Sequence, residues 1–181
     1  SIHEHQILVD KIKNSKNLKN INQISNIIAN SLKKAGTIFW CGNGGSASDS
    51  QHLSAELIGR LKKNRRPLRS ISLSSNISAI TCISNDFGYD KIFSRQIEGL
   101  ANKNDVIICI STSGNSKNIL EALKMAKKKR IKTISFLGSE GGKAIKFSQN
   151  SIVIPSKNTA RIQEMHIFLG QLICSNVEKI L

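Results

Sequence analysis

Apolar residues recur at helical spacing through the first part of the chain, up to about residue 35. Isoleucine and leucine return every three or four positions with lysine and asparagine between them, as on the buried face of a helix. The polar run at 14–17 predicts a break into two helices, and Gly36 is expected to cap the second one at its C-terminus. The apolar positions are Ile7, Leu8, Ile12, Leu18, Ile21, Ile24, Ile27, Ile28 and Leu32.

Beyond residue 36, short apolar runs alternate with helical stretches. The apolar runs predict strands at 37–41, 69–73, 105–110, 132–137 and 151–154. The remaining stretches predict helices at about 47–60, 76–85, 90–102, 116–129, 142–148 and 159–180. This order predicts an α/β fold in which helices flank a mostly parallel five-stranded sheet. One domain is expected over 1–181, with 1–35 as an N-terminal helical segment and 36–181 as the α/β core and a long C-terminal helix.

The composition fits a globular protein that meets anionic ligands. Hydrophobic residues make up 39% of the chain, and 27 Lys and Arg against 12 Asp and Glu give a formal net charge of +15. This charge favours nucleic acid, acidic membranes or phosphorylated metabolites, without choosing among them. The basic runs at 62–66 and 127–130 are expected on solvated surface, because no aromatic platform or nucleic-acid-binding motif accompanies them. We therefore expect no nucleic-acid partner.

Apolar runs and cysteine spacing bear on the location of the protein. No run approaches the roughly 20 apolar residues of a membrane-spanning helix, and the first residues are too polar for an export signal. The four cysteines lack the spacing of a metal site, and three of them lie in apolar stretches. Buried reduced thiols are typical of the cytoplasm, so a cytoplasmic protein without a membrane partner is expected.

A glycine-rich loop at 41–48, C-G-N-G-G-S-A-S, follows the first predicted strand. Glycines let backbone N–H groups approach an anion, and the helix that follows presents its positive end to it. Gly42, Gly44 and Ala47 also match the G-x-G-x-x-A pattern of dinucleotide sites. That function is disfavoured, because no acidic residue stands about 20 positions later to hold a ribose.

A second loop at 111–116, S-T-S-G-N-S, places four hydroxyl groups between a strand and a helix. Hydroxyls at a helix N-terminus suit a phosphate group. The alternative is an ordinary helix cap, but one serine suffices for a cap, and four favour phosphate. The loop is not a Walker A motif, since no Gly-Lys-Ser/Thr follows.

Polar residues on two predicted helices are candidates for chemistry. His52 and Glu56, spaced i, i+4, share a helix face and can bind a divalent metal or supply a base; a surface ion pair is the alternative. Gln163 and Gln171 lie about 80° apart around the last helix and can converge on one site. His166 points about 140° away from Gln171, so we expect it to be buried or in an interface.

The segment N-D-F-G at 85–88 has the composition of a turn. Asp86 within it can accept hydrogen bonds from sugar hydroxyls or cap the next helix.

Five motifs now stand in order along the chain, and together they resemble the phosphoheptose isomerase family within the sugar isomerase (SIS) fold. The resemblance covers nearly the whole chain. It implies a single SIS-type domain and the conversion of sedoheptulose 7-phosphate to D-glycero-D-manno-heptose 7-phosphate, for bacterial lipopolysaccharide or capsule. It also implies a cytoplasmic homotetramer with one zinc ion per subunit. The motifs are C-G-N-G-G-S at 41–46, H-L-S-A-E at 52–56, N-D-F-G at 85–88, S-T-S-G-N-S at 111–116 and R-I-Q-E-M-H at 161–166.

The resemblance also implies roles at matching positions. Glu56 is the expected catalytic base, and Gln171 stands at the position of a second acid/base. The expected substrate-binding residues are Asn43, Gly44, Gly45, Ser46, Glu56, Asn85, Asp86, Ser111, Thr112, Ser113, Ser116 and Gln163. The expected metal ligands are His52, Glu56, Gln163 and Gln171.

Two positions depart from the family pattern: Gln171 replaces the usual histidine, and Ala160 stands where some members carry aspartate. Glutamine cannot ionise usefully, and its carbonyl is a weaker zinc ligand than imidazole. A weakened metal site, or proton transfer by water or another group, is therefore expected.

Two other functions remain open. The first is a non-catalytic SIS-fold protein that binds the replication initiator, which Gln171 favours and the retained His52, Glu56 and Gln163 disfavour. The second is an isomerase of another phosphosugar.

Overall fold

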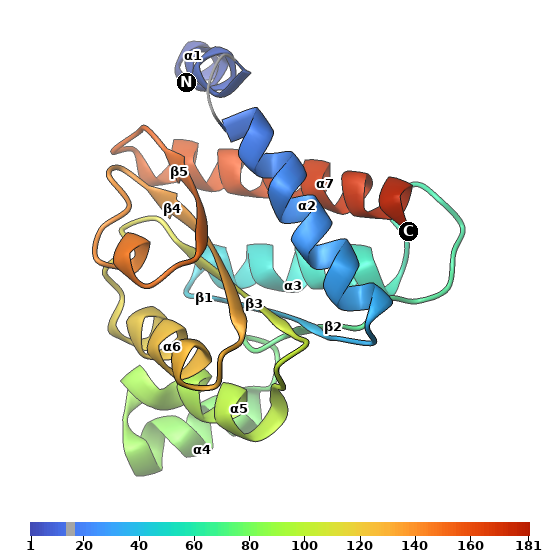
Figure 1. The fold of residues 1–181 in the computed structure, drawn as a ribbon. Coiled ribbons are helices and arrows are strands. Elements are labelled where there is room, and N and C mark those ends of the chain that lie inside the picture. Colours follow the sequence, from blue (N-terminus) through green and yellow to red (C-terminus); the bar gives the residue numbers. More distant parts are fainter. Residues whose placement is uncertain (14–16) are drawn as a thin grey trace.

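A single parallel sheet forms the centre of the molecule. The computed structural model describes residues 1–13 and 17–181. Five strands lie in the order β2-β1-β3-β4-β5, all parallel (Figure 1). Each predicted strand is present, with bounds shifted by one residue at most. The strands are β1 Ile38–Gly42, β2 Ser70–Ser72, β3 Val106–Ser111, β4 Lys132–Gly138 and β5 Asn150–Ile154.

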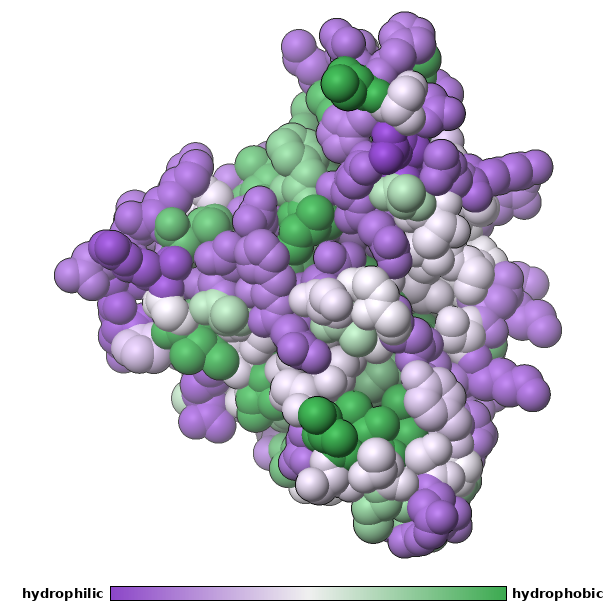
Figure 2. Space-filling model, turned by 180° about the vertical axis from the view of Figure 1, so that it is seen from behind, coloured by the Kyte–Doolittle hydropathy of each residue, from purple (hydrophilic) through white to green (hydrophobic). Residues whose placement is uncertain are grey.

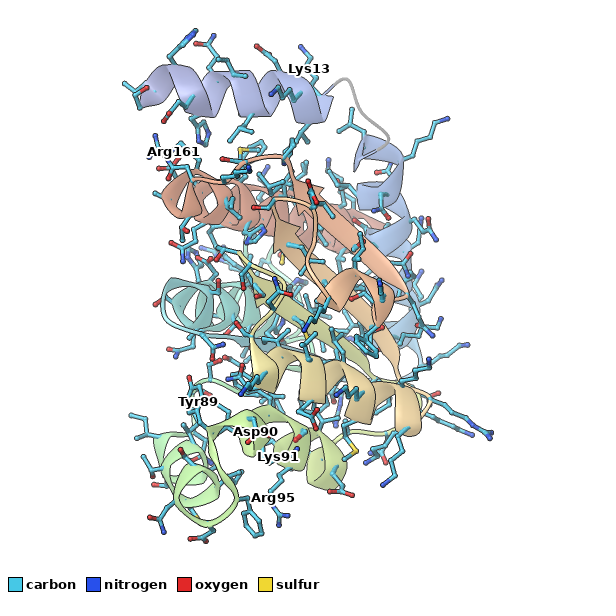
Figure 3. The ribbon with its side chains drawn as sticks, turned by 90° about the vertical axis from the view of Figure 1, so that its left-hand side faces the viewer. Lys13, Tyr89, Asp90, Lys91, Arg95 and Arg161 are labelled. Carbon is cyan, nitrogen blue, oxygen red and sulfur yellow. The ribbon has the colours of Figure 1, made fainter. Side chains whose placement is uncertain are left out.

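Helices cover both faces of this sheet, which is why the central strands are continuous apolar runs. One face is covered by α2 Asn17–Lys33, α3 Gly45–Ile58 and α7 Thr159–Ile180, with α1 Ile2–Lys13 against α7 (Figure 1). The other face is covered by α5 Ile92–Leu100 and α6 Lys117–Lys128, with α4 Ile77–Phe87 outside them. Figure 3 shows α1, α7, α3 and α4 stacked in that order. The short 3-10 turns are Tyr89–Lys91 and Ala144–Lys146.

Alternate side chains of each strand enter two separate cores. Trp40 and Phe136 lie in the core under α2, α3 and α7, whereas Phe39 and Phe93 lie in the core under α5 and α6. None of the helices described for 1–13 and 17–181 is long and apolar enough to cross a bilayer.

Helix α4 is apolar but contains no buried residue. Its first and last residues, Ile77 and Phe87, are 74% and 50% exposed. Figure 2 shows hydrophobic side chains at the surface of the lower part of the molecule, where α4 and α5 lie. This helix is an outer layer that the rest of the chain leaves uncovered.

Three local predictions are corrected by the structure. The left-handed residue after α2 is Ala35, with φ 57°, and Gly36 follows it, donating to the Ser31 carbonyl. Residues 85–87 complete α4, and Gly88 ends it at φ 90°. The helix predicted at 142–148 is only the turn Ala144–Lys146, because the preceding glycines have positive φ and the Ala144 N–H is bonded to the Gly114 carbonyl. Of the predicted break at 14–17, residues 14–16 lie outside the described residues.

The strand order creates a switch point between β1 and β3. From β1 the chain crosses over to β2 on one side, and from β3 it crosses over to β4 on the other. Gly42 at the end of β1 pairs with Ile110 near the end of β3. Ligands of open α/β sheets bind where the crossovers diverge in this way, so the two candidate loops meet at the expected place.

Candidate active site

Side chains join the two loops at the switch point. Asn43 and Asn118 exchange two amide hydrogen bonds of 2.9 and 2.7 Å. Tyr89, labelled in Figure 3, comes from the turn between α4 and α5, and its hydroxyl donates to Asn43 Oδ1 at 3.0 Å. These residues and Ser116 line an open cavity of about 650 Å³. No local pattern indicated Tyr89, because its partner lies 46 residues away.

The loop 111–116, which we call the hydroxyl turn, has its serine oxygens engaged by backbone amides. Ser111 Oγ accepts the Gly114 N–H, and Ser113 Oγ accepts the Asn115 N–H, both at 3.1 Å. Each of these hydroxyls still has its own proton to donate. Ser116 occupies the N-cap position of α6 but makes no side-chain cap bond. The simple helix-cap alternative therefore does not account for these hydroxyls. Ser111 is buried, whereas Thr112, Ser113 and Ser116 are accessible enough to donate to an anion.

A neighbouring loop holds the hydroxyl turn in place. Lys143 N–H donates to Asn115 Oδ1 at 3.0 Å. Gly114 and Gly142 both have positive φ, and a Cβ on Gly142 would lie 2.4 Å from the Ser113 carbonyl oxygen. The loop after β4 can approach this closely only because these positions are glycine.

Helix α3 carries Ser46 at one end and Glu56 at the other. Gly45, Asp49, His52 and Glu56 form a stripe along one side of α3, because residues three or four apart share a helix face. Ser46 and Glu56 are separated by about 15 Å along the axis at 1.5 Å per residue. The first end lies at the switch point, and the second lies against α7.

His52, Glu56 and Gln171 come together at that second end. His52 Nε2 lies 3.0 Å from Glu56 Oε1, and Gln171 Nε2 lies 3.3 Å from the same oxygen. The two nitrogens are 3.4 Å apart. The consistent arrangement has His52 and Gln171 both donating to Glu56. The Glu56 carboxylate is 15% exposed and His52 is 51% exposed, so a ligand can reach the cluster.

Gln163 does not join this cluster within the described chain. It lies beside the start of α3, where a Cβ on Gly45 would be 2.5 Å from its Nε2. Eight residues separate it from Gln171, about 12 Å along α7. The expectation that Gln163 and Gln171 converge considered only their angle around the helix and neglected their separation along its axis.

Asn85 and Asp86 lie in the last turn of α4 and are exposed. Asn85 Nδ2 donates to Asp86 Oδ1 at 2.8 Å, and Cys82 Sγ lies 3.6 Å from Asp86 Oδ2. The 3-10 turn that follows, Tyr89–Lys91, has Gly88 at its N-cap position and no side-chain cap bond, so Asp86 does not cap it. Their expected contact with sugar hydroxyls remains a prediction.

Asp49 was missed by the sequence argument, although its i, i+3 spacing to His52 could have indicated it. Burial raises the pKa of Asp49 to about 6, and the charge of His52 opposes this rise. Its buried Oδ2 has no hydrogen-bond partner among the residues that the structure describes. Between the two ends of the α3 stripe thus lies a carboxylate whose Oδ2 is buried and makes no hydrogen bond to the described residues.

The buried His166 and cysteines match their predictions. His166 is fully buried, and its Nε2 bonds to the Leu137 carbonyl at 3.1 Å. All four cysteines are free, and three of them, Cys41, Cys109 and Cys174, are buried. These residues belong to the core of the fold.

The His52–Glu56–Gln171 cluster has a donor set that fits a divalent metal in part. His52 and Glu56 are ordinary zinc ligands, and their 3.0 Å separation lets both reach one ion. Gln171 adds an amide, which suits harder cations better than zinc. Among the described residues, no group of three His, Cys, Asp or Glu side chains is placed to hold a metal.

Comparison with known proteins defines the class of protein to which this chain belongs. The SIS domain family matches residues 2–138, more than half of the chain. The chain therefore belongs to the SIS domain family.

Similar proteins define the particular family. The phosphoheptose isomerase of a Nitratiruptor species is 48% identical over 97% of this chain and 94% of that protein. The phosphoheptose isomerase of Helicobacter pylori is 49% identical over 88% and 83% of the two chains. The solved phosphoheptose isomerase of Neisseria gonorrhoeae has a TM-score of 0.92 and 34% identity, covering 98% and 95%. The chain is a member of the phosphoheptose isomerases, which are aldose–ketose isomerases.

Proposed function

We propose that this chain converts sedoheptulose 7-phosphate to D-glycero-D-manno-heptose 7-phosphate through an enediol, for bacterial lipopolysaccharide or capsule. The observation that carries the proposal is helix α3, which begins at the switch point, after β1 and beside the end of β3, and carries Glu56 near its other end. A phosphorylated sugar is arranged in the same way, with the phosphate dianion at one end and the reacting carbons at the other. The net charge of +15 favours such an anionic substrate.

In this proposal the hydroxyl turn and the glycine-rich loop bind the phosphate and the nearby hydroxyls. Ser111, Thr112, Ser113 and Ser116 donate to phosphate oxygens, while Gly44, Gly45 and Ser46 present the N-terminus of α3. Asn43 lines the cavity between them. Fixing the remote phosphate orients the reacting carbons and provides binding energy for catalysis.

Glu56 acts as the base that removes the proton from C1 and returns it to C2. His52 and Gln171 donate to its carboxylate and hold it in place. Gln171 cannot exchange a proton itself, so the hydroxyl proton moves through water or another group. General acid–base catalysis of this kind contributes about 10²–10⁴ in rate.

We propose zinc as the cofactor, with His52, Glu56 and Gln171 as the ligands that one chain supplies; a bound ion would replace the hydrogen bonds that these three side chains make to one another. A bound zinc ion would polarise a substrate oxygen as a Lewis acid. Binding is expected to be weaker than in a site with two histidines, because an amide replaces an imidazole. Metal analysis of the purified protein, before and after dialysis against a chelator, tests this.

We further propose a cytoplasmic homotetramer. The uncovered apolar side chains of α4 suit burial between copies, and the four free cysteines suit a reducing compartment. Sedimentation velocity tests the oligomeric state. Mixing Glu56→Gln chains with Ser113→Ala chains then shows how the site is built, because activity returns only if two copies share one site.

The proposed reaction is tested by incubating the protein with sedoheptulose 7-phosphate and following heptose 7-phosphate by NMR. Turnover is expected, and its absence in metal-loaded protein would contradict the proposal. The rival function, a non-catalytic protein that binds the replication initiator, predicts no turnover with any phosphosugar. An isomerase of another sugar predicts turnover with that sugar only.

A further inference from the structure

The C-terminus of α3, which carries Glu56, is held by one arginine. Arg65 Nη2 donates to the Glu56 carbonyl oxygen at 2.8 Å, and Nη1 donates to those of Leu57 and Gly59 at 2.9 and 3.2 Å. The last carbonyls of a helix have no partner within the helix, so such donors fix a turn that would otherwise fray. A cation at this end also complements the helix dipole.

Arg65 is itself held by α7. Its Nε donates to Glu178 Oε1 at 3.0 Å, and Nη2 lies 3.0 Å from the same oxygen. The side chains of Arg65 and Glu178 are 13% and 1% exposed. Glu178 also accepts the backbone N–H groups of Leu61, Lys62 and Lys63 at 3.0–3.3 Å. This ion pair is therefore buried and its acceptor oxygens are used, unlike an ordinary surface pair.

Glu178 and Gln171 share one face of α7, because seven residues are close to two full turns. Gln171 contacts the Glu56 side chain, while Glu178 reaches the Glu56 carbonyl through Arg65. The contacts form a closed ring: Glu56 side chain, Gln171, helix α7, Glu178, Arg65 and Glu56 backbone. Both the backbone and the carboxylate of Glu56 are thus fixed relative to α7.

We infer that Arg65 and Glu178 are positioning residues for the isomerisation, setting the place of the Glu56 carboxylate relative to Gln171 and His52. The inference rests on the proposed role of Glu56 as the base. A carboxylate that moves a proton between adjacent carbons must be fixed closely, since a displacement of about 1 Å can reduce a rate by about 10²-fold. The proposed phosphate-binding end of α3, at Ser46, lies nearly three helical turns away and is not part of this ring.

Two conservative variants test the inference. Arg65→Lys keeps the charge but loses the planar fork that bridges carbonyls and carboxylate, and Glu178→Gln keeps the size but loses the charge. We expect kcat for sedoheptulose 7-phosphate to fall at least about tenfold in each, with KM changed less than about twofold. The concentration of folded protein is measured for each variant, because unfolded chains lower the apparent kcat and leave KM unchanged. When kcat is calculated per folded chain, a general loss of folded protein no longer imitates the expected result.

Asp105→Asn is the matched control. Asp105 is a buried carboxylate that also accepts backbone N–H groups, those of Thr37 and Asn102, but its described bonds lie outside the ring. The Asp105→Asn substitution is expected to lower the Tm while leaving kcat near the wild-type value.

The outcomes separate the two hypotheses. An inactive wild-type protein overturns the proposed function and this inference with it. If the wild type is active, three results overturn this inference and leave the proposed function standing. They are an unchanged kcat in both ring variants, a rise in KM in place of the fall in kcat, and a loss of kcat in Asp105→Asn as large as in the ring variants. Failure of both ring variants to fold also overturns it, because the pair would then serve folding and not positioning.

Discussion

The fully buried His166 allows a quantitative prediction about acid stability. Burial lowers the pKa of His166 from an ordinary 6.5 to about 4, although the hydrogen bond to Leu137 opposes this shift. Its Nδ1 has no partner in the described part of the chain, and the ring packs 6.0 Å from that of Phe136. The folded protein therefore keeps this ring neutral where the unfolded chain would protonate it.

The sign and size of the effect follow from this difference. Because the folded-state pKa is depressed, the unfolded chain binds more protons between pH 6.5 and pH 4. The stabilisation is complete above pH 6.5 and is lost as the pH falls through 4. A shift from 6.5 to about 4 corresponds to about 3 kcal/mol of unfolding free energy.

His166→Gln removes the titration and keeps an amide that can donate to the Leu137 carbonyl. Urea unfolding of both proteins is measured from pH 7 to pH 4 at one chain concentration, since association would shift apparent stability. The variant is expected to be less stable at pH 7, because its packing is imperfect, and to gain about 3 kcal/mol relative to wild type by pH 4. Asp49 titrates in both proteins, so its contribution cancels in the difference between their unfolding free energies. Parallel pH profiles would refute the reasoning.

Three further predictions concern the site. Glu56→Gln is expected to lower kcat by about 10²–10⁴ with little change in KM, and near wild-type turnover by NMR would show that another group is the base. Asp49→Asn is expected to raise the unfolding free energy by about 1 kcal/mol at pH 8, because solvent screening at this partly exposed carboxylate reduces the cost of about 3 kcal/mol that the raised pKa implies. That gain should vanish below pH 4, where the wild-type carboxyl is protonated; a gain that persists at low pH would contradict a charge effect. Gln171→His is expected to slow zinc loss during chelator dialysis, and equal retention in both proteins would place the metal elsewhere.

Much of the fold follows from local sequence pattern. The central strands β1, β3 and β4 are buried on both sides, so their apolar runs are nearly continuous, and the bounds of all five strands were predicted within one residue. The long helix at 159–180 was also predicted with its observed bounds. The error at 142–148 falls where a non-local contact overrides local preference, because the bond from Ala144 to Gly114 holds the chain in a turn.

Only part of the candidate site could be predicted from the sequence. His52 and Glu56 share a face by helical spacing, and the composition of the hydroxyl turn indicates an anion site. Gln163 and Gln171 were expected to converge, but an angular argument cannot show that their axial separation places them at opposite ends of the site. Arg65 was assigned to solvated surface because it lies in a basic run, whereas its side chain is only 13% exposed and pairs with a carboxylate 113 residues away.

The sequence alone determined the local elements, the anion-binding loops and the residue types available for chemistry, because periodicity and turn composition act over a few residues. The tertiary structure decided which of these groups meet. The order β2-β1-β3-β4-β5 joins two loops about 70 residues apart, as the pairing of Gly42 with Ile110 shows, and the packing of α3 on α7 brings Gln171 to Glu56 across 115 residues. Such contacts depend on helix rise, strand order and burial summed over the whole chain, and no single segment encodes them.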